Sequence, residues 1–202
     1  MIRRIALALT FAITLPVFAA RVGAPAPTFT GTDSHGSTIS LSQYRGKYVV
    51  LEWTNKDCPY TRAQYESGNM QALQRKWTAK GVVWLTILSS APGHQGYMTA
   101  AQENAWIQTV HADPTAAILD PDGTIGMAYG AKTTPHMFVI NPEGKLIYDG
   151  AIDDHPTTDS SAVDKAHNYV TDALTEAMAG RVVATDYTRP YGCSVKYASE
   201  GE

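Results

Sequence analysis

The sequence predicts an α/β domain with a central mixed β-sheet and helices on both faces. Continuous apolar runs rich in β-branched residues, YVVLEW (48–53) and VVWLTIL (82–88), alternate with stretches of helical periodicity. Strands joined by helical crossovers pair in parallel. Two later runs, HMFVIN and KLIYDG, are separated only by the turn residues PEG, which indicates a hairpin and hence an antiparallel edge.

Each remaining element has its own local signal. Between the first two strands, residues 69–81 place three apolar side chains on one helical face: Met70, Leu73 and Trp77. After the second strand, Thr99 and Gln102 form a capping-box pattern that begins another helix. The run AAILD (116–120) is a short strand followed by the turn PDG.

The last predicted helix covers residues 160–180. Its apolar positions recur at helical spacing, at Val163, Ala166, Val170, Leu174 and Ala177. The resulting order β-α-β-α-β-β-α is that of the thioredoxin fold. We therefore expect one domain over residues 20–180, followed by a tail, residues 181–202.

The first 19 residues have the features of a secretory signal peptide. Arg3 and Arg4 precede an apolar run of about 11 residues, too short for a membrane-spanning helix, and a small-residue cleavage pattern ends at Ala19. The predicted location is therefore the periplasm. Cleavage would leave 183 residues with 14 basic and 19 acidic side chains. With no basic run, neither nucleic acid nor a membrane is expected as a partner.

Cys58 is the strongest candidate for a catalytic residue. It follows a buried strand, and Pro59 behind it is typical of the first position of a helix. A cysteine at a helix N-cap has its thiolate favoured by the helix dipole, which lowers the thiol pKa. Thr61, one turn on, would place its hydroxyl near the sulfur. The alternative is an inert, buried small side chain.

Two other positions, Glu52 and Pro135, belong to this prediction. Glu52 lies in an otherwise apolar strand, so either it is partly buried with a raised pKa suited to moving protons, or it is solvated at the strand end. Pro135, after Thr134, precedes a strand; sequence alone favours an ordinary loop proline over a cis bond.

The histidines and the acidic turn give weaker signals. His136 either tunes the thiolate or lies at the surface, and a two-ligand copper site with Cys58 is a minor alternative. No histidines have zinc-ligand spacing, so neither a metal nor a cofactor is expected. The turn of Asp153, Asp154 and His155 is interpreted as a solvated loop.

Residues 22–179 resemble the thioredoxin-like redoxins of the alkyl-hydroperoxide-reductase and thiol-antioxidant type. The resemblance lies in GAPAPTFTGTDSHGSTISLSQYRGKYVVLEW and in AYGAKTTPHMFVINPEGKLIYDGAID. It implies that Cys58 is the nucleophile, that Glu52 is the buried acid and that Pro135 is the cis-proline. Thr134 and Pro135 would then offer backbone groups to a bound substrate. The second cysteine of the thioredoxin motif is replaced by Thr61.

The comparison with peroxiredoxins is less complete. Like them, the chain has proline directly after the reactive cysteine, but Asn55 stands where they carry threonine. Their arginine falls near Pro135, so both groups that would polarise a peroxide are missing. The ending TRPYGCSVKY closely resembles the Gly-Cys-Ser tail of a peroxiredoxin-like subgroup.

Cys193, in that tail, is the only other cysteine of the chain. The predicted function is thiol–disulfide oxidoreduction, in which Cys58 attacks and Cys193 resolves, with a thiol or disulfide protein as partner. Two alternatives stay open: a thiol peroxidase, and a non-catalytic binding protein in which a Cys58–Cys193 disulfide only staples the tail. The sequence does not fix the oligomeric state.

Overall fold

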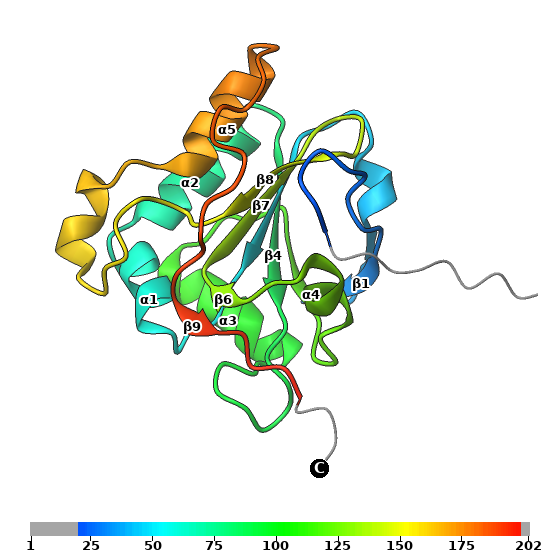
Figure 1. Ribbon diagram of the computed structural model, residues 1–202. Helices are drawn as coiled ribbons and strands as arrows, with labels where there is room; N and C mark the ends of the chain where they lie inside the picture. Colours follow the sequence, from blue (N-terminus) through cyan, green and yellow to red (C-terminus); the bar gives the residue numbers. More distant parts are fainter. Residues whose placement is uncertain (1–19, 199–202) are drawn as a thin grey trace, which may run out of the picture.

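The computed structural model describes residues 20–198, so the predicted signal peptide, residues 1–19, lies outside the described residues. A seven-stranded sheet forms the centre, in the order β2-β1-β5-β4-β3-β7-β8 (Figure 1). The strands are β1 (Thr30–Asp33), β2 (Thr38–Ser40), β3 (Val49–Trp53), β4 (Val83–Leu88), β5 (Ala116–Leu119), β7 (His136–Ile140) and β8 (Leu146–Gly150). Strands β3, β4 and β5 are parallel and the other pairs are antiparallel. This is the predicted mixed sheet.

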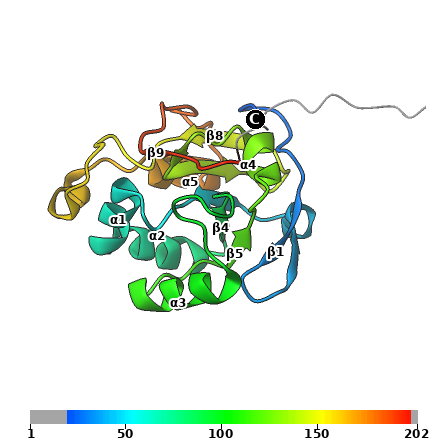
Figure 2. The ribbon, with the colours of Figure 1, turned by 90° about the horizontal axis from the view of Figure 1, so that it is seen from below.

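The helices cover both faces of this sheet, four of them on one face and α4 on the other. They are α1 (Pro59–Glu66), α2 (Asn69–Thr78), α3 (Ala100–Val110), α4 (Thr124–Tyr129) and α5 (Tyr169–Met178), with 3₁₀ helices η1 (Leu41–Tyr44) and η2 (Ser160–Lys165). Core contacts place α1, α2, α3 and α5 on one face, and Figure 2 shows α1, α2 and α3 together there. Helix α4 packs on the opposite face, with the N-terminal segment.

Strand β3 is central because its side chains supply both faces of the sheet. Val50 packs with α2 and α5, while Leu51 and Trp53 point to the other face. There the Trp53 ring lies 5.1 Å from Phe138 and 5.5 Å from Tyr129, centroid to centroid. All five residues of β3 are buried, as the continuous apolar run predicts. The segment that follows β3, which carries Cys58, is therefore attached to a fully buried strand in the interior of the sheet.

Two predictions about helices were wrong. The single helix expected over residues 160–180 is divided into η2 and α5, because Asn168 caps α5 by accepting a hydrogen bond from the Thr171 N–H at 2.8 Å. Helix α4 was missed. Its start follows Asp120, whose carboxylate accepts hydrogen bonds from the backbone N–H groups of Ile125 and Gly126. A side-chain cap therefore sets the start of α5, whereas the N-cap of α4 is Gly123 and the N–H groups of its first turn are bound by Asp120 from outside the helix.

The tail crosses the molecule and does not extend away from it. After α5 it runs alongside β8 and then pairs with the segment before β7 (Figure 1). This pairing is a separate two-stranded antiparallel sheet of β6 (Thr133–Thr134) and β9 (Cys193–Ser194). We call residues 186–197 the tail strap.

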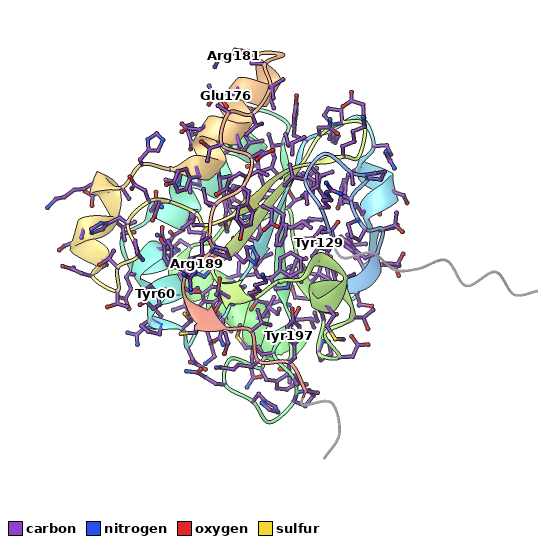
Figure 3. The ribbon with its side chains drawn as sticks, in the orientation of Figure 1. Tyr60, Tyr129, Glu176, Arg181, Arg189 and Tyr197 are labelled. Atoms are coloured by element: carbon purple, nitrogen blue, oxygen red, sulfur yellow. The ribbon has the colours of Figure 1, made fainter. Side chains whose placement is uncertain are left out.

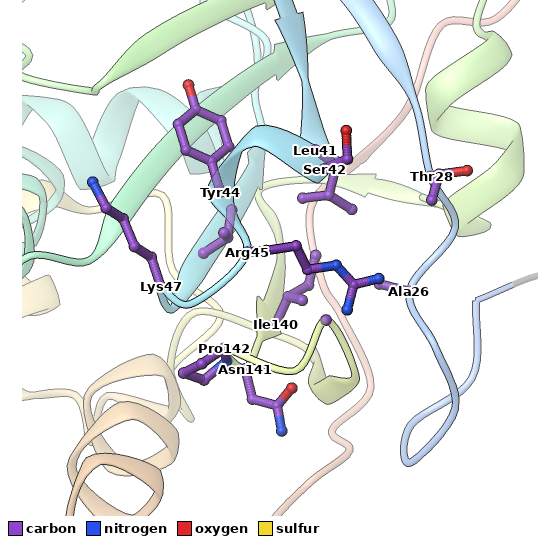
Figure 4. Close-up of a pocket in the computed structure, with 12 residues that line it drawn as sticks. Ala26, Thr28, Leu41, Ser42, Tyr44, Arg45, Lys47, Ile140, Asn141 and Pro142 are labelled. Carbon is purple, nitrogen blue, oxygen red and sulfur yellow. The ribbon is translucent and has the colours of Figure 1, made fainter.

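One small pocket lies at the opposite end of the sheet from Cys58. It is lined by residues at the start of β3 and at the β7–β8 turn, among them Arg45, Val49, Pro142 and Gly144 (Figure 4). Val49 pairs with Ile140 at that end, whereas Trp53 and His136 pair at the end nearer Cys58. None of the predicted site residues lines this pocket. Within residues 20–198, no helix is both long enough and apolar enough to cross a membrane.

Candidate active site

Cys58 is the N-cap of α1, as predicted. Its backbone is extended (φ −76°, ψ 122°), and Pro59 takes the first helical position. The Cys58 side chain makes no capping hydrogen bond to the helix, so the sulfur points elsewhere. Its backbone N–H donates to the Asn55 carbonyl at 3.0 Å, which fixes the turn between β3 and α1. The strand end and the helix start together determine the position of the sulfur.

The sulfur lies against the segment that precedes β7. The Cys58 thiol donates a hydrogen bond to the Thr134 carbonyl oxygen at 2.9 Å. The Thr134–Pro135 peptide bond is cis, as the resemblance implied and as the sequence alone did not favour. Cys58 and Thr61 are fully buried, and Thr134 is only 2% exposed. The hydroxyls of Thr61 and Thr134 have no hydrogen-bond partner among the described residues.

This environment favours the thiolate of Cys58. Burial raises the pKa of the thiol, but the Cys193 thiol, the Thr134 hydroxyl and the backbones of Thr61 and Cys193 surround the sulfur with donors that stabilise a thiolate, and together they lower the pKa overall. The free Thr134 hydroxyl is thus a donor that a thiolate can use. None of these groups carries a positive charge, in contrast to the arginine that peroxide reduction would require.

Cys193 is brought to the same place by the tail strap. In the β6–β9 sheet it lies directly opposite Thr134, whose carbonyl oxygen accepts the hydrogen bond from the Cys58 thiol. Both cysteines are free thiols in the structure, and Cys193 is partly exposed. Burial, followed by the hydrogen bond to Cys58 and the charge of Cys58, raises the pKa of Cys193 to about 11. One sulfur is therefore suited to be a nucleophile and the other to be a proton donor.

Glu52 is fully buried and its pKa is raised by burial, against four hydrogen bonds that lower it. The donors are Tyr65 at 2.7 Å, Trp84 at 2.8 Å, Gln74 at 3.1 Å and Thr86 at 3.4 Å. The alternative of a solvated carboxylate was wrong. Tyr65 and Gln74 lie on helices α1 and α2, and the other two donors lie on the neighbouring strand β4. Cys58 is not among the four donors.

The surface interpretation of His136 was also wrong. This residue is 2% exposed. Its Nδ1 accepts the Lys132 backbone N–H at 3.1 Å, so Nε2 carries the proton and donates to Asp149 at 2.8 Å. Both ring nitrogens are thereby occupied, and neither is free for a copper ion. His136 instead holds the loop that leads into β6.

The turn at residues 153–155 was predicted as a solvated loop, and this is wrong for Asp153. Asp154 and His155 are exposed, but Asp153 is 2% exposed. Its carboxylate accepts hydrogen bonds from Gln64 at 2.7 Å and from the Tyr191 hydroxyl at 2.5 Å. It thus links helix α1 to the tail strap.

Sequence reasoning missed the residues that hold this strap. Tyr191 also packs its ring against Tyr60, with centroids 5.7 Å apart, and Figure 3 shows Tyr60 beside the strap. Gly192 is equally specific, because a Cβ there would lie 2.1 Å from the Thr134 carbonyl oxygen. The Gly-Cys pair and the aromatic residue before it were visible in the sequence, but their contacts are with residues far away in the chain.

The geometry, a buried N-cap cysteine beside a cis-proline in a mixed sheet, defines a thioredoxin-like redoxin. Solved structures agree on the fold. An uncharacterized conserved protein from Geobacillus kaustophilus matches with a TM-score of 0.77 at 20% identity, over 90% of this chain and 94% of that one. The thioredoxin domain of a thiol-disulfide oxidoreductase from Bacteroides vulgatus matches with a TM-score of 0.51 at 20% identity, over 73% of this chain and 98% of that one.

Residues 22–149 match the model of the AhpC/TSA family, and the chain belongs to this family. Among curated proteins, the thiol-disulfide oxidoreductase ResA of Bacillus subtilis is similar: 28% identical over 151 residues, which cover 69% of this chain and 75% of ResA.

Proposed function

We propose that this chain is an exported thiol–disulfide oxidoreductase in which Cys58 is the nucleophile and Cys193 the resolving thiol. One observation carries the proposal. Cys193 lies opposite Thr134, whose carbonyl accepts the Cys58 thiol proton, and the pKa values of the two thiols are shifted in opposite directions. The similarity to ResA supports the same reaction class. Export rests on the signal-peptide pattern of residues 1–19 and places the reaction in the periplasm.

The reaction proceeds in two exchanges. The Cys58 thiolate attacks one sulfur of a substrate disulfide, which forms a mixed disulfide and releases the other substrate sulfur as a thiolate. Cys193 then loses its proton and attacks the Cys58 sulfur, which releases the second substrate thiolate and leaves a Cys58–Cys193 disulfide. The substrate gains two electrons and two protons, and the cysteine pair loses them. An external dithiol donor returns the pair to the reduced state by the same chemistry.

The neighbouring residues have supporting roles in this scheme. Pro59 begins the helix whose dipole favours the thiolate, and Thr61 and Thr134 supply hydrogen bonds to it. Pro135 shapes the substrate side of the site. To Glu52, whose pKa is raised by burial, we assign the transfer of a proton during the resolving exchange. A Glu52→Gln variant would then slow the resolving exchange while the first attack keeps its rate.

The reduction potential of the cysteine pair tests the proposal. Protein without residues 1–19 is equilibrated in thiol redox buffers, alkylated and weighed by mass spectrometry. A Cys58–Cys193 potential between about −120 and −270 mV falls among known exchange catalysts and supports the proposal. A value below roughly −300 mV identifies a structural staple and refutes it. The absence of any Cys58–Cys193 disulfide would equally refute the assignment of Cys193.

A further inference from the structure

With the tail strap in place, Cys58 has no path to an external disulfide. Cys58 is 0% exposed, and β9 pairs with β6, where the Thr134 carbonyl accepts the hydrogen bond from the Cys58 thiol. The strap is held by main-chain pairing: Thr133 pairs with Ser194 and Thr134 with Cys193, and the Val195 N–H donates to the Lys132 carbonyl at 3.0 Å. A substrate can reach the sulfur only after β9 has left β6.

When β9 leaves, β6 becomes a free sheet edge directly beside the nucleophile. Unpaired N–H and C=O groups along an edge bind another extended segment in the same way that they bound the first. The register is already defined, because the residue opposite Thr134 is the one that brings a sulfur to Cys58. A cavity of about 520 Å³ flanks the strap, lined by Thr133 of β6 and by Asp153 among others. Residues 188–192 of the strap, which precede the paired strand, form the other part of its wall.

The tail strap also shows which side chains such a segment must have. Gly192, directly before the cysteine, has a φ of +130°, and a Cβ there would lie 2.1 Å from the Thr134 oxygen and 2.8 Å from its carbonyl carbon. Those atoms belong to the backbone next to Pro135, so they cannot rotate aside to make room for a methyl group. One residue earlier, Tyr191 reaches the Asp153 carboxylate and the Tyr60 ring.

We propose that β6, Asp153 and Tyr60 form a docking site for an extended segment of a partner protein with an aromatic residue and then glycine directly before its disulfide-bonded cysteine. The tail strap is the chain's own occupant of that site. This inference rests on the proposed function. The order of events follows from it: the strap detaches, the partner strand pairs with β6, and Cys58 attacks the partner's cysteine to form the mixed disulfide. Return of β9 then displaces the partner strand as Cys193 attacks Cys58, so resolution and release are one movement.

The test uses the full chain after residue 19 with Cys193→Ser, which prevents resolution and traps the mixed disulfide. The probe is the decapeptide TRPYGCSVKY, the sequence of residues 188–197, with its cysteine joined to glutathione. Two matched peptides replace the glycine or the first tyrosine, in the position of Tyr191, with alanine. Glutathione disulfide is the undocked control, and reactions in guanidinium give the intrinsic reactivity of each peptide. Formation of the Cys58–peptide disulfide is followed by mass spectrometry.

We expect the glycine peptide to react about tenfold faster than its alanine counterpart with the folded protein. An alanine methyl at this position would collide with the Thr134 carbonyl, and its backbone would be strained at positive φ. The rates become equal in guanidinium. The peptide lacking the tyrosine falls between them. If both peptides react equally while glutathione disulfide oxidises Cys58, the docking inference is wrong and the proposed function stands. If neither the peptides nor glutathione disulfide react with Cys58, the proposed function fails and the inference with it.

Discussion

The Tyr191 hydroxyl donates a 2.5 Å hydrogen bond to the Asp153 carboxylate, across 38 positions of sequence. This bond holds the tail strap two residues before Cys193. The other oxygen of the Asp153 carboxylate accepts a hydrogen bond from Gln64 of α1. The position of the second thiol therefore depends on a contact between the tail and the turn after β8.

Loss of this bond should release the strap more often. A hydrogen bond to a charged group contributes about 1.5–3 kcal/mol, and each 1.4 kcal/mol is about tenfold in an equilibrium. We expect Tyr191→Phe to speed iodoacetamide alkylation of Cys58 about tenfold, measured by mass spectrometry in a Cys193→Ser background. Tyr187→Phe is the matched control, since the Tyr187 side chain is 55% exposed and its hydroxyl has no partner among the described residues. Equal alkylation rates in the two variants would show that the bond does not hold the strap.

A side chain at position 192 should loosen β9 without unfolding the domain. In Gly192→Ala the new methyl meets the Thr134 carbonyl, so β9 has to move away from β6. We expect the Val195 amide, which donates to the Lys132 carbonyl, to exchange its hydrogen about tenfold faster or more. Gly180→Ala is the control, because Gly180 also has positive φ (+73°) but nothing lies within 4 Å of its Cβ position. Unchanged protection of Val195 would contradict the close approach.

The two thiols should titrate separately. Hydrogen bonds, among them one from the Cys193 thiol, lower the Cys58 pKa against the effect of burial, whereas the pKa of Cys193 is raised to about 11. Carbon-13 shifts of labelled cysteine Cβ atoms in the reduced protein should therefore show the first step at Cys58, below the usual value of 9.0. In Cys193→Ala the thiol donor is lost and this first midpoint moves up. A midpoint that does not move would exclude Cys193 as a donor to Cys58.

Glu103 should make the protein less stable as the pH rises. Its carboxylate is fully buried on α3 with no partner among the described residues, and burial, followed by the charge of Glu52, raises its pKa to about 8. In the unfolded chain a glutamate titrates near about 4.3. Between these values the folded state binds more protons at Glu103, so the contribution of Glu103 to the free energy of unfolding is most favourable below about pH 4.3 and declines until about pH 8.

Urea unfolding across this pH range measures the effect. Glu103→Gln should flatten the decline, and Glu66→Gln, at an exposed position on α1, should leave it as it is. A decline of the same slope in Glu103→Gln would place the responsible group elsewhere.

The sequence predicted the parts of the site that are local. Strand β3 follows from a continuous apolar run, and Cys58 as N-cap follows from the Cys-Pro pair, since both signals involve adjacent residues. The cis bond before Pro135 needed the family resemblance. The boundary at Asn168 was missed because the helical spacing of apolar residues continues from η2 into α5, across the side-chain cap that separates the two helices.

The remaining features depend on contacts between distant segments. Asp153 had no local sign of burial, because its partners, Gln64 and Tyr191, lie 89 and 38 positions away. Likewise, the Gly-Cys pair of the tail gave no indication that it would pair with Thr134. Hydrophobic pattern and caps determine where elements begin and end, but not where an irregular tail binds.

The second thiol is carried on a tail and not in α1. A single proteolytic cut between α5 and the tail strap would therefore separate the chain segments that carry the two cysteines. Residues 179–185 connect α5 to the tail strap, and Val182 there is 90% exposed. A single cut at this position in the reduced protein would leave Cys193 held only by the noncovalent contacts of the tail strap, and release of the strap would then leave Cys58 with its helix and cis-proline. Such a product is a one-cysteine redoxin, dependent on small thiols for turnover. In the oxidised protein the same cut would leave both pieces covalently joined.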